Sequence, residues 1–447
     1  MNHARLSEHR QFLAGKIVVG IDPSKDKHQA AVVDPQGNQI GRSFSFPTTS
    51  AGYNKLLSGE LPKLVGTSAS PENVVFALET ACNLWETLAF FLHNRGYTVV
   101  LVSPLSTHHA RPILSIEFSR TDPKDAYVVA TVAQRGAFTV YERFPAANNA
   151  THLLAITYDK LRKELAQNRA RVRAMLDRLF PEFPRIINPH TDSAVYLLKR
   201  YLFPDDFLAL DIDLESEALA KISRRQLGRE ELLELRAAAC TSIGVVRQDD
   251  ERIAERLALD AFLATIETLE HQFTQLEREL LKRVEPLEQH QRLTSLSGVG
   301  KRLAALFLAE VRDLSRYTHF KSIEKLAGFN LRLFDSGRFT GTRHISSLGN
   351  SRLRWILYKM AEETARRVPE VRRKYLRRQI KRRSHIRNVV ACVPTLLQLI
   401  IAMEREKRPY QHRQDHLNEL KELEAKYQAL RAASPKNTKR KEAKAAA

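Results

Sequence analysis

The chain has 447 residues, of which 43% are hydrophobic, and 71 lysines and arginines oppose 51 aspartates and glutamates, which gives a formal net charge of +20. At roughly 150 residues per domain this length predicts about three structural units, and the hydrophobic content excludes a chain that is disordered throughout. The charge favours a polyanionic partner, either nucleic acid or an anionic membrane surface, and identifies no fold.

Hydropathy and the positions of the cysteines exclude further classes of protein. No apolar run reaches the ~18 residues of a membrane span, and the N-terminus lacks the apolar stretch of a signal peptide. Cys82, Cys240 and Cys392 lie far apart and form no CxxC pair, so neither a disulfide framework nor a cysteine zinc site is predicted. We therefore expect a cytoplasmic protein without a membrane partner.

Residues 1–149 are predicted to form an α/β domain. Apolar runs predict five strands, at 16–22, 28–33, 39–46, 74–79 and 98–102. Turn-forming residues separate the second run from the third, so the first three strands should form an antiparallel meander. The later strands alternate with helical patterns, which predicts a partly parallel, buried sheet. This is the element order of the ribonuclease H-like fold.

Residues 150–290 are predicted to be helical with sustained heptads. Two apolar series with 4-3 spacing carry them: Leu154, Tyr158, Leu161, Leu165, Asn168, Val172, Met175 and Leu179; and Leu259, Phe262, Ile266, Leu269, Phe273, Leu276 and Leu280. The spacing is typical of a coiled coil, folded back on itself or formed between subunits, and an ordinary helical bundle within one chain is an equal alternative. Asn168 at a core position would set the register.

The rest of the chain divides into residues 291–410, a second compact helical unit rich in glycine and basic residues, and 411–447, a polar basic tail. The sequence after Ser434 is typical of disorder.

Four acids stand where two-metal chemistry would need them. Asp22 ends the first strand, Glu79 ends the fourth, and Asp122 and Asp125 open a helix with Pro123 at its first turn. Their i, i+3 spacing puts the last two carboxylates near one face. Four clustered carboxylates would repel one another unless Mg²⁺ or Mn²⁺ neutralised them, so we expect a metal site.

Each acid also has a structural interpretation. Asp22 could belong to a turn, Asp122 could cap the helix, Asp125 could be a solvated first-turn acid, and Glu79 could pair with a cation. For any one acid the structural interpretation is the more common one. The order of all four is much harder to obtain by chance.

The segments Val19–Lys25, Ala77–Thr80 and Arg120–Ala126 resemble the DEDD motifs of insertion-sequence transposases with a RuvC-like N-terminal domain, the bridge-RNA-guided recombinases. Leu296–Gly300, Phe334–Gly337 and Ile345–Arg354 resemble the transposase domain of the same family, in the expected order. The resemblance covers roughly residues 16–410.

This resemblance implies a DNA recombinase that cleaves and rejoins strands through a serine, at the position of Ser336 here, which becomes linked to a DNA phosphate. It also implies donor and target DNA, a structured noncoding bridge RNA as guide, and a homo-oligomer, a dimer or a tetramer when DNA is synapsed. A bacterial cytoplasmic location, at the nucleoid when active, fits this role.

Two glycine-containing turns and one basic run are candidate nucleic-acid contacts. Ser297–Lys301 resembles a helix-hairpin-helix turn, with a plain helical connection as an even alternative, and Gly349–Arg352 offers similar geometry. Residues 366–387 contain eleven basic residues against Glu370 alone, which predicts a basic helix, with Pro369 a break or a start. The candidate side chains are Lys301, Arg302, Arg338, Arg343, Arg352, Arg354, Arg373, Arg377 and Lys381.

Two other functions remain open from sequence. One is a metal-dependent junction nuclease that uses the acids alone, with water as the nucleophile. The other is a non-catalytic scaffold that binds RNA and DNA. Loss of covalent protein–DNA adducts in Ser336→Ala would exclude the first, and loss of recombination in Asp22→Asn would exclude the second.

Overall fold

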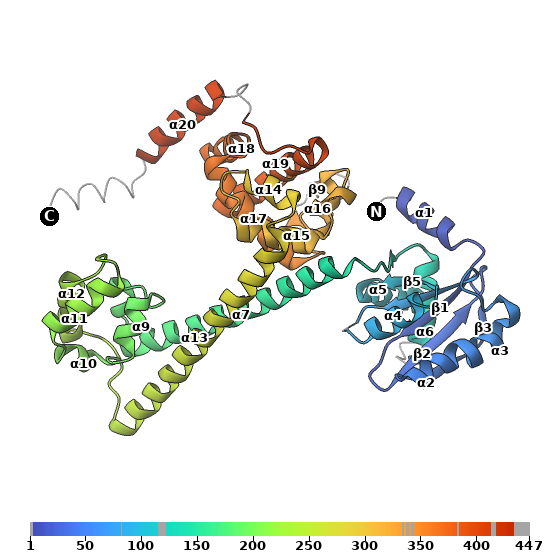
Figure 1. Cartoon of the computed structure of the whole chain (residues 1–447), viewed down its shortest axis with the longest axis horizontal. Helices are drawn as coiled ribbons and strands as arrows, with labels where there is room; N and C mark the ends of the chain where they lie inside the picture. Colours follow the sequence, from blue (N-terminus) through green and yellow to red (C-terminus); the bar gives the residue numbers. More distant parts are fainter. Residues whose placement is uncertain are drawn as a thin grey trace. The chain divides into compact units, whose positions relative to one another are not determined.

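The computed structural model divides the chain into two compact units, Met1–Arg143 and Phe144–Ala447, coloured along the chain in Figure 1. The residues that it describes are 3–81, 83–114, 122–332, 335–336, 339–340, 344–381, 384–412 and 417–432. The boundary lies six residues before the expected one, and the regions expected at 150–290 and 291–410 share the second unit.

A six-stranded mixed sheet forms the centre of the N-terminal unit. Its strands lie in the order β3 (Gln39–Pro47), β2 (Lys27–Val33), β1 (Ile17–Asp22), β4 (Val74–Glu79), β5 (Thr98–Val102) and β6 (Thr139–Val140). The first three strands are antiparallel neighbours, β1, β4 and β5 are parallel, and β6 returns antiparallel. The predicted α/β sheet is confirmed, and β6 is an addition that the sequence pattern did not show.

The turn between β2 and β3 forms as its residues predict. The Asp34 carboxylate accepts hydrogen bonds from the backbone N–H groups of Gln36 and Asn38 at 2.9 and 2.8 Å. Gly37 has a φ of +97°, a conformation that glycine adopts without a steric cost. This tight turn fixes the register of the meander.

Helices cover both faces of the sheet. One face packs against α2 (Ser50–Lys55), η1 (Leu56–Glu60), α3 (Leu61–Val65) and α4 (Trp85–His93), and η2 (Gly66–Ser68) follows α3. The other face packs against α6 (Asp122–Gln134), with α1 (His3–Leu13) and α5 (Pro104–Leu114) beside it. The parallel strands are therefore buried on both sides, as their continuous apolar runs indicated.

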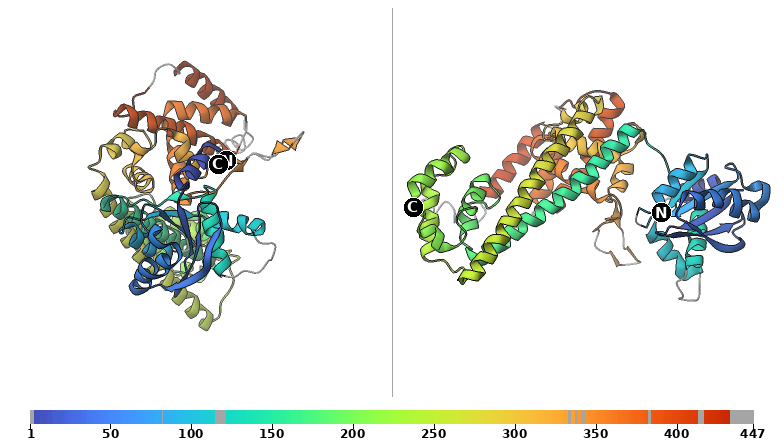
Figure 2. Two further views of the ribbon diagram at one scale, coloured as in Figure 1. Left: turned by 90° about the vertical axis from the view of Figure 1, so that its right-hand side faces the viewer. Right: turned by 60° about the horizontal axis from the view of Figure 1, so that its bottom comes forward.

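Two long helices run antiparallel in the second unit, α7 (Ala146–Leu179) and α13 (Asp249–Val284), as Figure 2 shows. The rings of Tyr158 and Phe273 lie 4.1 Å apart between centroids, and Arg169 donates to Glu270 at 2.6 Å. The two heptad segments thus pack on each other within one chain. Asn168 is buried, but its amide donates to the Glu164 carbonyl at 2.9 Å within α7, so this bond does not cross to α13.

Short helices close the far end of this pair, as expected for the helical stretch around 185–245. They are α8 (Phe183–Ile186), α9 (Asp192–Leu198), α10 (Pro204–Leu208), α11 (Ile212–Ile222) and α12 (Arg229–Cys240). Phe180, Phe183 and Phe207 form the aromatic centre of their core.

The C-terminal helices form a second core at the base of the long pair. They are α14 (Glu288–Thr294), α15 (Lys301–Val311), η3 (Leu314–Arg316), α16 (Phe320–Leu326), α17 (Ser351–Arg367), α18 (Pro369–Ile380), α19 (His385–Glu406) and α20 (Leu417–Ala432). Tyr158 of α7 and Leu280 of α13 belong to this core, which explains why the long helices and the C-terminal helices form one unit.

Between α16 and α17 lie two short strand pairs: β7 (Leu331–Arg332) with β10 (His344–Ile345), and β8 (Asp335–Ser336) with β9 (Phe339–Thr340).

Helix α19 is long and apolar enough to cross a membrane by length and composition. Its residues Val389, Val393, Leu397 and Ile400 are buried in the C-terminal core, among side chains of α15 and α17. Core packing therefore accounts for its hydropathy.

The polar tail expected from 411 onward contains α20, a helix of 16 residues that was not predicted from the sequence. Leu420 is its only buried residue, so the segment carries too little apolar periodicity to be recognised as a packed helix from sequence.

Candidate functional site

The strand ends of β1 and β4 place two acids together. These strands are parallel neighbours, with Ile21 opposite Leu78, so Asp22 and Glu79 follow at adjacent positions of the sheet edge. Side chains alternate across a sheet. Ile21 and Leu78 face one core, so Asp22 and Glu79 project to the opposite face, which α6 covers.

Helix α6 approaches this face through Gly20. A Cβ atom at Gly20 would lie 2.3 Å from the Ala126 carbonyl oxygen and 2.5 Å from the Ala130 nitrogen. The helix backbone therefore rests directly on β1, two residues before Asp22. Asp125 precedes Ala126 in α6, so this close approach brings it to the edge where Asp22 lies.

Helix α5 supplies partners for two of the acids. The Thr107 hydroxyl donates to the buried Glu79 carboxylate at 2.6 Å, and the Arg111 Nε donates to Asp125 at 2.8 Å. Thr107 and Arg111 are four residues apart and share one face of α5. Hydrogen bonds and the Arg111 cation thus stabilise the carboxylates in this structure.

The chemistry of these side chains suits a hard divalent cation, because Asp22, Glu79 and Asp125 offer carboxylate oxygens at one sheet edge. Among the described side chains, however, no group of three or more His, Cys, Asp or Glu residues is close enough to hold a metal ion. Asp122 begins α6, but its side chain lies outside the described residues. The four-acid site stays a prediction.

Ser336 lies in β8, where it is paired with Phe339 of β9. This register makes Ser336 the last paired residue before a two-residue connection, so its backbone belongs to the tip of a hairpin. Its side chain is outside the described residues, as are Arg338 and Arg343 altogether. The role of the Ser336 hydroxyl therefore stays a prediction.

The segment Ser297–Lys301 leads from helix α14 into helix α15, as expected from the sequence. Gly298 has a φ of +100°, and a Cβ there would meet the Glu363 backbone at 2.9 Å, so glycine is required. Lys301 pairs with Glu285 at 2.9 Å and Arg302 with Glu277 at 3.7 Å, and both side chains keep more than half of their surface exposed. Both cations can still reach a phosphate.

The second turn differs from the expectation that Gly349–Arg352 presents free backbone N–H groups. The Asn350 side chain caps α17 and accepts the N–H groups of Arg352 and Leu353 at 3.0 and 3.1 Å. The Arg352 guanidinium donates two bonds to the buried Glu310. Asn350 thus occupies these two N–H groups in this structure, and binding of a phosphate at this turn stays a prediction.

Arg354 has a structural partner as well. Its guanidinium donates to the carbonyl oxygens of Ala327 at 2.9 Å and Ser347 at 3.3 Å. These bonds tie α17 to the end of α16. Contacts of Arg352 and Arg354 with nucleic acid stay predictions, but each guanidinium already holds the fold together.

The predicted basic helix over residues 366–387 does not form as one helix: α17 ends at Arg367, α18 spans Pro369–Ile380, and α19 begins at His385. Pro369 starts α18, as one of the two expectations had it. Arg373 and Arg377 both donate to Glu419 of α20, the former at 3.1 Å, and Arg372 donates to Glu424 at 2.5 Å. Lys381 is exposed, and no acidic partner is recorded for it within the described part of the chain. The helix is basic as predicted, but α20 covers part of it.

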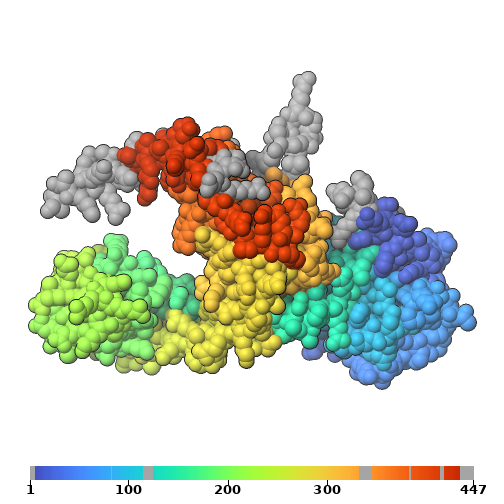
Figure 3. Space-filling model, turned by 45° about the horizontal axis from the view of Figure 1, so that its top comes forward, coloured from blue at the N-terminus to red at the C-terminus, as the bar shows by residue number. Residues whose placement is uncertain are grey.

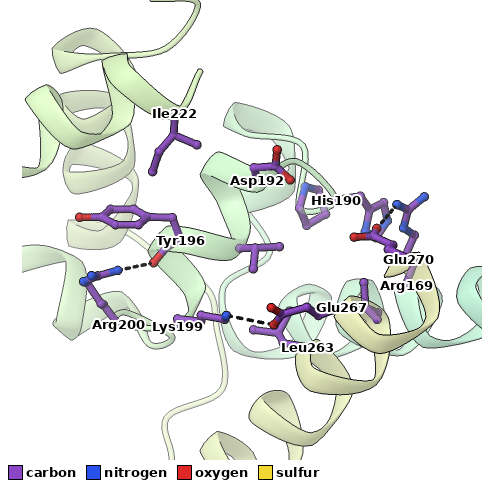
Figure 4. A pocket seen from close by; sticks show the side chains of 13 residues that line it. Arg169, His190, Asp192, Tyr196, Lys199, Arg200, Ile222, Leu263, Glu267 and Glu270 are labelled. Atoms are coloured by element: carbon purple, nitrogen blue, oxygen red, sulfur yellow. Dashed lines mark hydrogen bonds and ion pairs between the residues drawn. The ribbon is translucent and has the colours of Figure 1, made fainter. Parts of the chain in front are cut away.

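A cavity of about 380 Å³ lies between α9 and the long helices of the second unit (Figure 4). Two ion pairs border it, Arg169 with Glu270 and Lys199 with Glu267. Since its cations are balanced by carboxylates, the cavity has no marked preference for an anion.

Sequence reasoning missed Gly20, Thr107 and Arg111. Gly20 stands two residues before Asp22, and this spacing could have identified it as a site of close helix packing. No local pattern marks Thr107 or Arg111, because their partners lie in other elements.

Comparison with known proteins identifies the family of the chain. A family model described as a transposase matches residues 19–181, and a model of the transposase IS116/IS110/IS902 family matches 290–377. The 44.8 kDa protein of insertion element IS116 from Streptomyces clavuligerus is 26% identical over 397 residues, which cover 88% of this chain and 96% of the relative. The 43.6 kDa protein of insertion element IS110 from Streptomyces coelicolor is 25% identical over 428 residues, 89% and 96% of the two chains. The chain belongs to the IS110/IS116/IS902 family of DEDD transposases.

Proposed function

We propose that the chain is an insertion-element recombinase that exchanges DNA strands through a phosphoserine intermediate. The N-terminal unit would be a ribonuclease H/RuvC-like catalytic domain. One observation carries the proposal: Asp22 and Glu79 end neighbouring parallel strands on the face where α6 brings Asp125. A metal-dependent phosphodiester site needs this convergence of carboxylates.

Asp22, Glu79, Asp122 and Asp125 would hold Mg²⁺ or Mn²⁺, which would supply charge stabilisation at the scissile phosphate. The Arg111 guanidinium, which donates to one oxygen of Asp125, would compete electrostatically with the cation for this carboxylate. Thr107 can keep its bond to Glu79, because a carboxylate has two oxygens and about four acceptor sites.

Ser336 would be the nucleophile. Its Oγ loses a proton and forms a bond to phosphorus, and the bond from phosphorus to one deoxyribose oxygen breaks, with a proton taken up by the leaving oxygen. A hydroxyl of the other DNA strand then attacks the phosphoserine and releases Ser336. One phosphate ester replaces another at each step, so rejoining requires no external energy source.

The remaining parts of the proposal concern partners. Donor and target DNA would pair with a structured noncoding bridge RNA, which would read sequence in place of side chains. Ser336 belongs to the C-terminal unit, so it must be presented to the acids in its own chain or from a second copy, which fits a dimer or a synaptic tetramer. The net charge of +20 suits a protein with several nucleic-acid partners.

A recombination assay with and without the element's noncoding RNA tests the proposal. We expect product only with the RNA, covalent protein–DNA adducts in the wild type, and neither product nor adduct in Ser336→Ala. Cutting that persists in Ser336→Ala without adducts would replace the proposal by a nuclease that uses water. Undiminished recombination in Asp22→Asn would refute the catalytic role of the acids.

A further inference from the structure

Helix α18 carries a cationic stripe. Arg373 and Arg377 are four residues apart, so they lie along one face of the helix, and Lys381 follows directly after its end. Arg372 borders this stripe. Guanidinium groups in such a row match the oxygens of successive phosphates, and their planar N–H donors can bind each phosphate through two bonds.

Helix α20 covers this stripe with two glutamates. Glu419 accepts hydrogen bonds from both Arg373 and Arg377, and Glu424 accepts one from Arg372. The guanidinium of Arg377 lowers the pKa of Glu419, so this carboxylate is charged at neutral pH. Oxygens of α20 thus take the positions where phosphate oxygens would bind.

The negative charges of α20 act through their positions, because the helix as a whole has no excess of them. The helix contains three acidic and three basic residues, so it has no net charge. Glu419 and Glu424 face α18, whereas Lys421 and Lys426 are exposed. The attraction between α20 and α18 therefore depends on the positions of two carboxylates, those of Glu419 and Glu424.

Little else holds α20 in place. Leu420 is its only buried side chain, and 9% of its surface is still exposed. The Arg377 side chain keeps 54% of its surface exposed and Glu424 keeps 41%, and ion pairs of this kind contribute little net stability. Figure 3 shows α20, in red, at the surface of the unit. An element with so few apolar contacts can detach without unfolding the core.

We propose that α20 is an internal competitor of nucleic acid: its glutamates occupy the α18 stripe until a sugar–phosphate backbone displaces them. This inference rests on the proposed nucleic-acid function and adds regulation to it. A polyanion that neutralises several cations also releases counterions, an advantage that one short helix lacks. Free α18 would bind backbone oxygens without regard to sequence.

The test compares two isosteric variants of the full chain, Glu419→Gln and Glu422→Gln. Each removes one negative charge from α20, but Glu422 is exposed and has no recorded bond to α18. The probes are fluorescein-labelled 20-nucleotide strands of thymidine DNA and uridine RNA, with affinity measured by anisotropy at about 100 mM salt. Nucleic acid can bind only to molecules in which α20 is undocked, so the apparent affinity is reduced in proportion to the undocked fraction. We therefore expect Glu419→Gln to bind the probes about 3- to 10-fold more tightly than wild type, and Glu422→Gln to bind them like wild type.

A third variant locates the binding surface. Adding Arg377→Gln to Glu419→Gln should abolish the gain, and a gain that persists would mean that nucleic acid binds elsewhere and would overturn the inference. A gain in either probe supports it, and the probe that gains more identifies the strand type. Equal affinities of Glu419→Gln and Glu422→Gln would refute competition while leaving nucleic-acid binding intact. If no variant bound either probe, the nucleic-acid role of α18 itself would fail.

Discussion

The acidic sheet edge and the basic helix α18 are both charged, but they differ in what surrounds their charges. At the edge, strand register places Asp22 and Glu79, and the adjoining α5 supplies Thr107 to Glu79 and Arg111 to Asp125 of α6. On α18, Arg373 and Arg377 are paired with Glu419, more than 40 residues further along the chain. A rigid sheet fixes where its acids lie, whereas the exposure of a basic helix depends on what docks on it.

The largest effect should come from the sheet edge. Asp22→Asn keeps the shape of the side chain and removes its charge, so strand exchange should fall by more than about 100-fold, since even partners behind a metal ligand account for 10- to 100-fold. Asp26→Asn is the matched control, because Asp26 is exposed in the loop that follows β1. The measurement is recombinant product per unit time. Equal loss in both variants would show that loop charge matters rather than Asp22.

The close packing that supports the edge gives the next largest effect. Gly20→Ala places a methyl group against the α6 backbone, and overpacking should reduce the free energy of unfolding of the N-terminal unit by about 2–3 kcal/mol. Trp85 fluorescence during urea unfolding reports on this unit if Trp355 is replaced by Phe. Gly59→Ala, whose Cβ would lie 3.6 Å from Lys55, should change little. Similar values for both variants would argue against a close helix approach at Gly20.

Acid should weaken the same unit through His28. This residue is fully buried, accepts the Ser24 N–H at 3.2 Å and contacts the Tyr53 hydroxyl at 3.0 Å, and burial lowers its pKa to about 4.

Because the unfolded chain takes up this proton near pH 6.5 and the folded chain only near pH 4, stability falls as the pH drops through this window. The loss between pH 7 and pH 5 should be about 2 kcal/mol. His28→Gln retains a donor and an acceptor and should unfold with a flatter pH dependence, measured by the same fluorescence. An unchanged slope would assign the acid sensitivity to other groups.

The smallest effect concerns Arg111. Its guanidinium would compete with a metal for Asp125, so Arg111→Gln should bind Mn²⁺ about 2- to 5-fold more tightly, the range expected for a weak ion pair that is partly open to solvent. Arg135→Gln removes an exposed charge of the same unit and serves as the control in calorimetric titrations. Weaker binding in Arg111→Gln would mean that Arg111 orients Asp125 instead.

Local patterns predicted much of the fold. Alternating and continuous apolar runs placed the strands from β1 to β5, because strand burial leaves a direct pattern in sequence. The heptads predicted α7 and α13, and Pro369 marked the start of α18.

Other features depend on contacts between distant segments. The pairing of Arg352 with buried Glu310 and the cover that Glu419 gives α18 join residues at least 40 positions apart, and no periodicity encodes such pairs. The α20 helix buries one leucine, so its tertiary contacts rather than its own pattern hold it. Glu79 was identifiable as a strand end and Asp125 as a helix start, but their partners Thr107 and Arg111 were not identifiable.

Binding of Mn²⁺ to the full chain, followed by calorimetry or by the electron paramagnetic resonance of the free ion, tests the central claim most directly. Glu79→Gln preserves the acceptor for Thr107 and removes only the charge, and Glu72→Gln is the matched exposed control in the same unit. The account predicts at least about 10-fold weaker binding in Glu79→Gln and wild-type binding in Glu72→Gln. Equal affinity in all three proteins would contradict a metal site at the ends of β1 and β4.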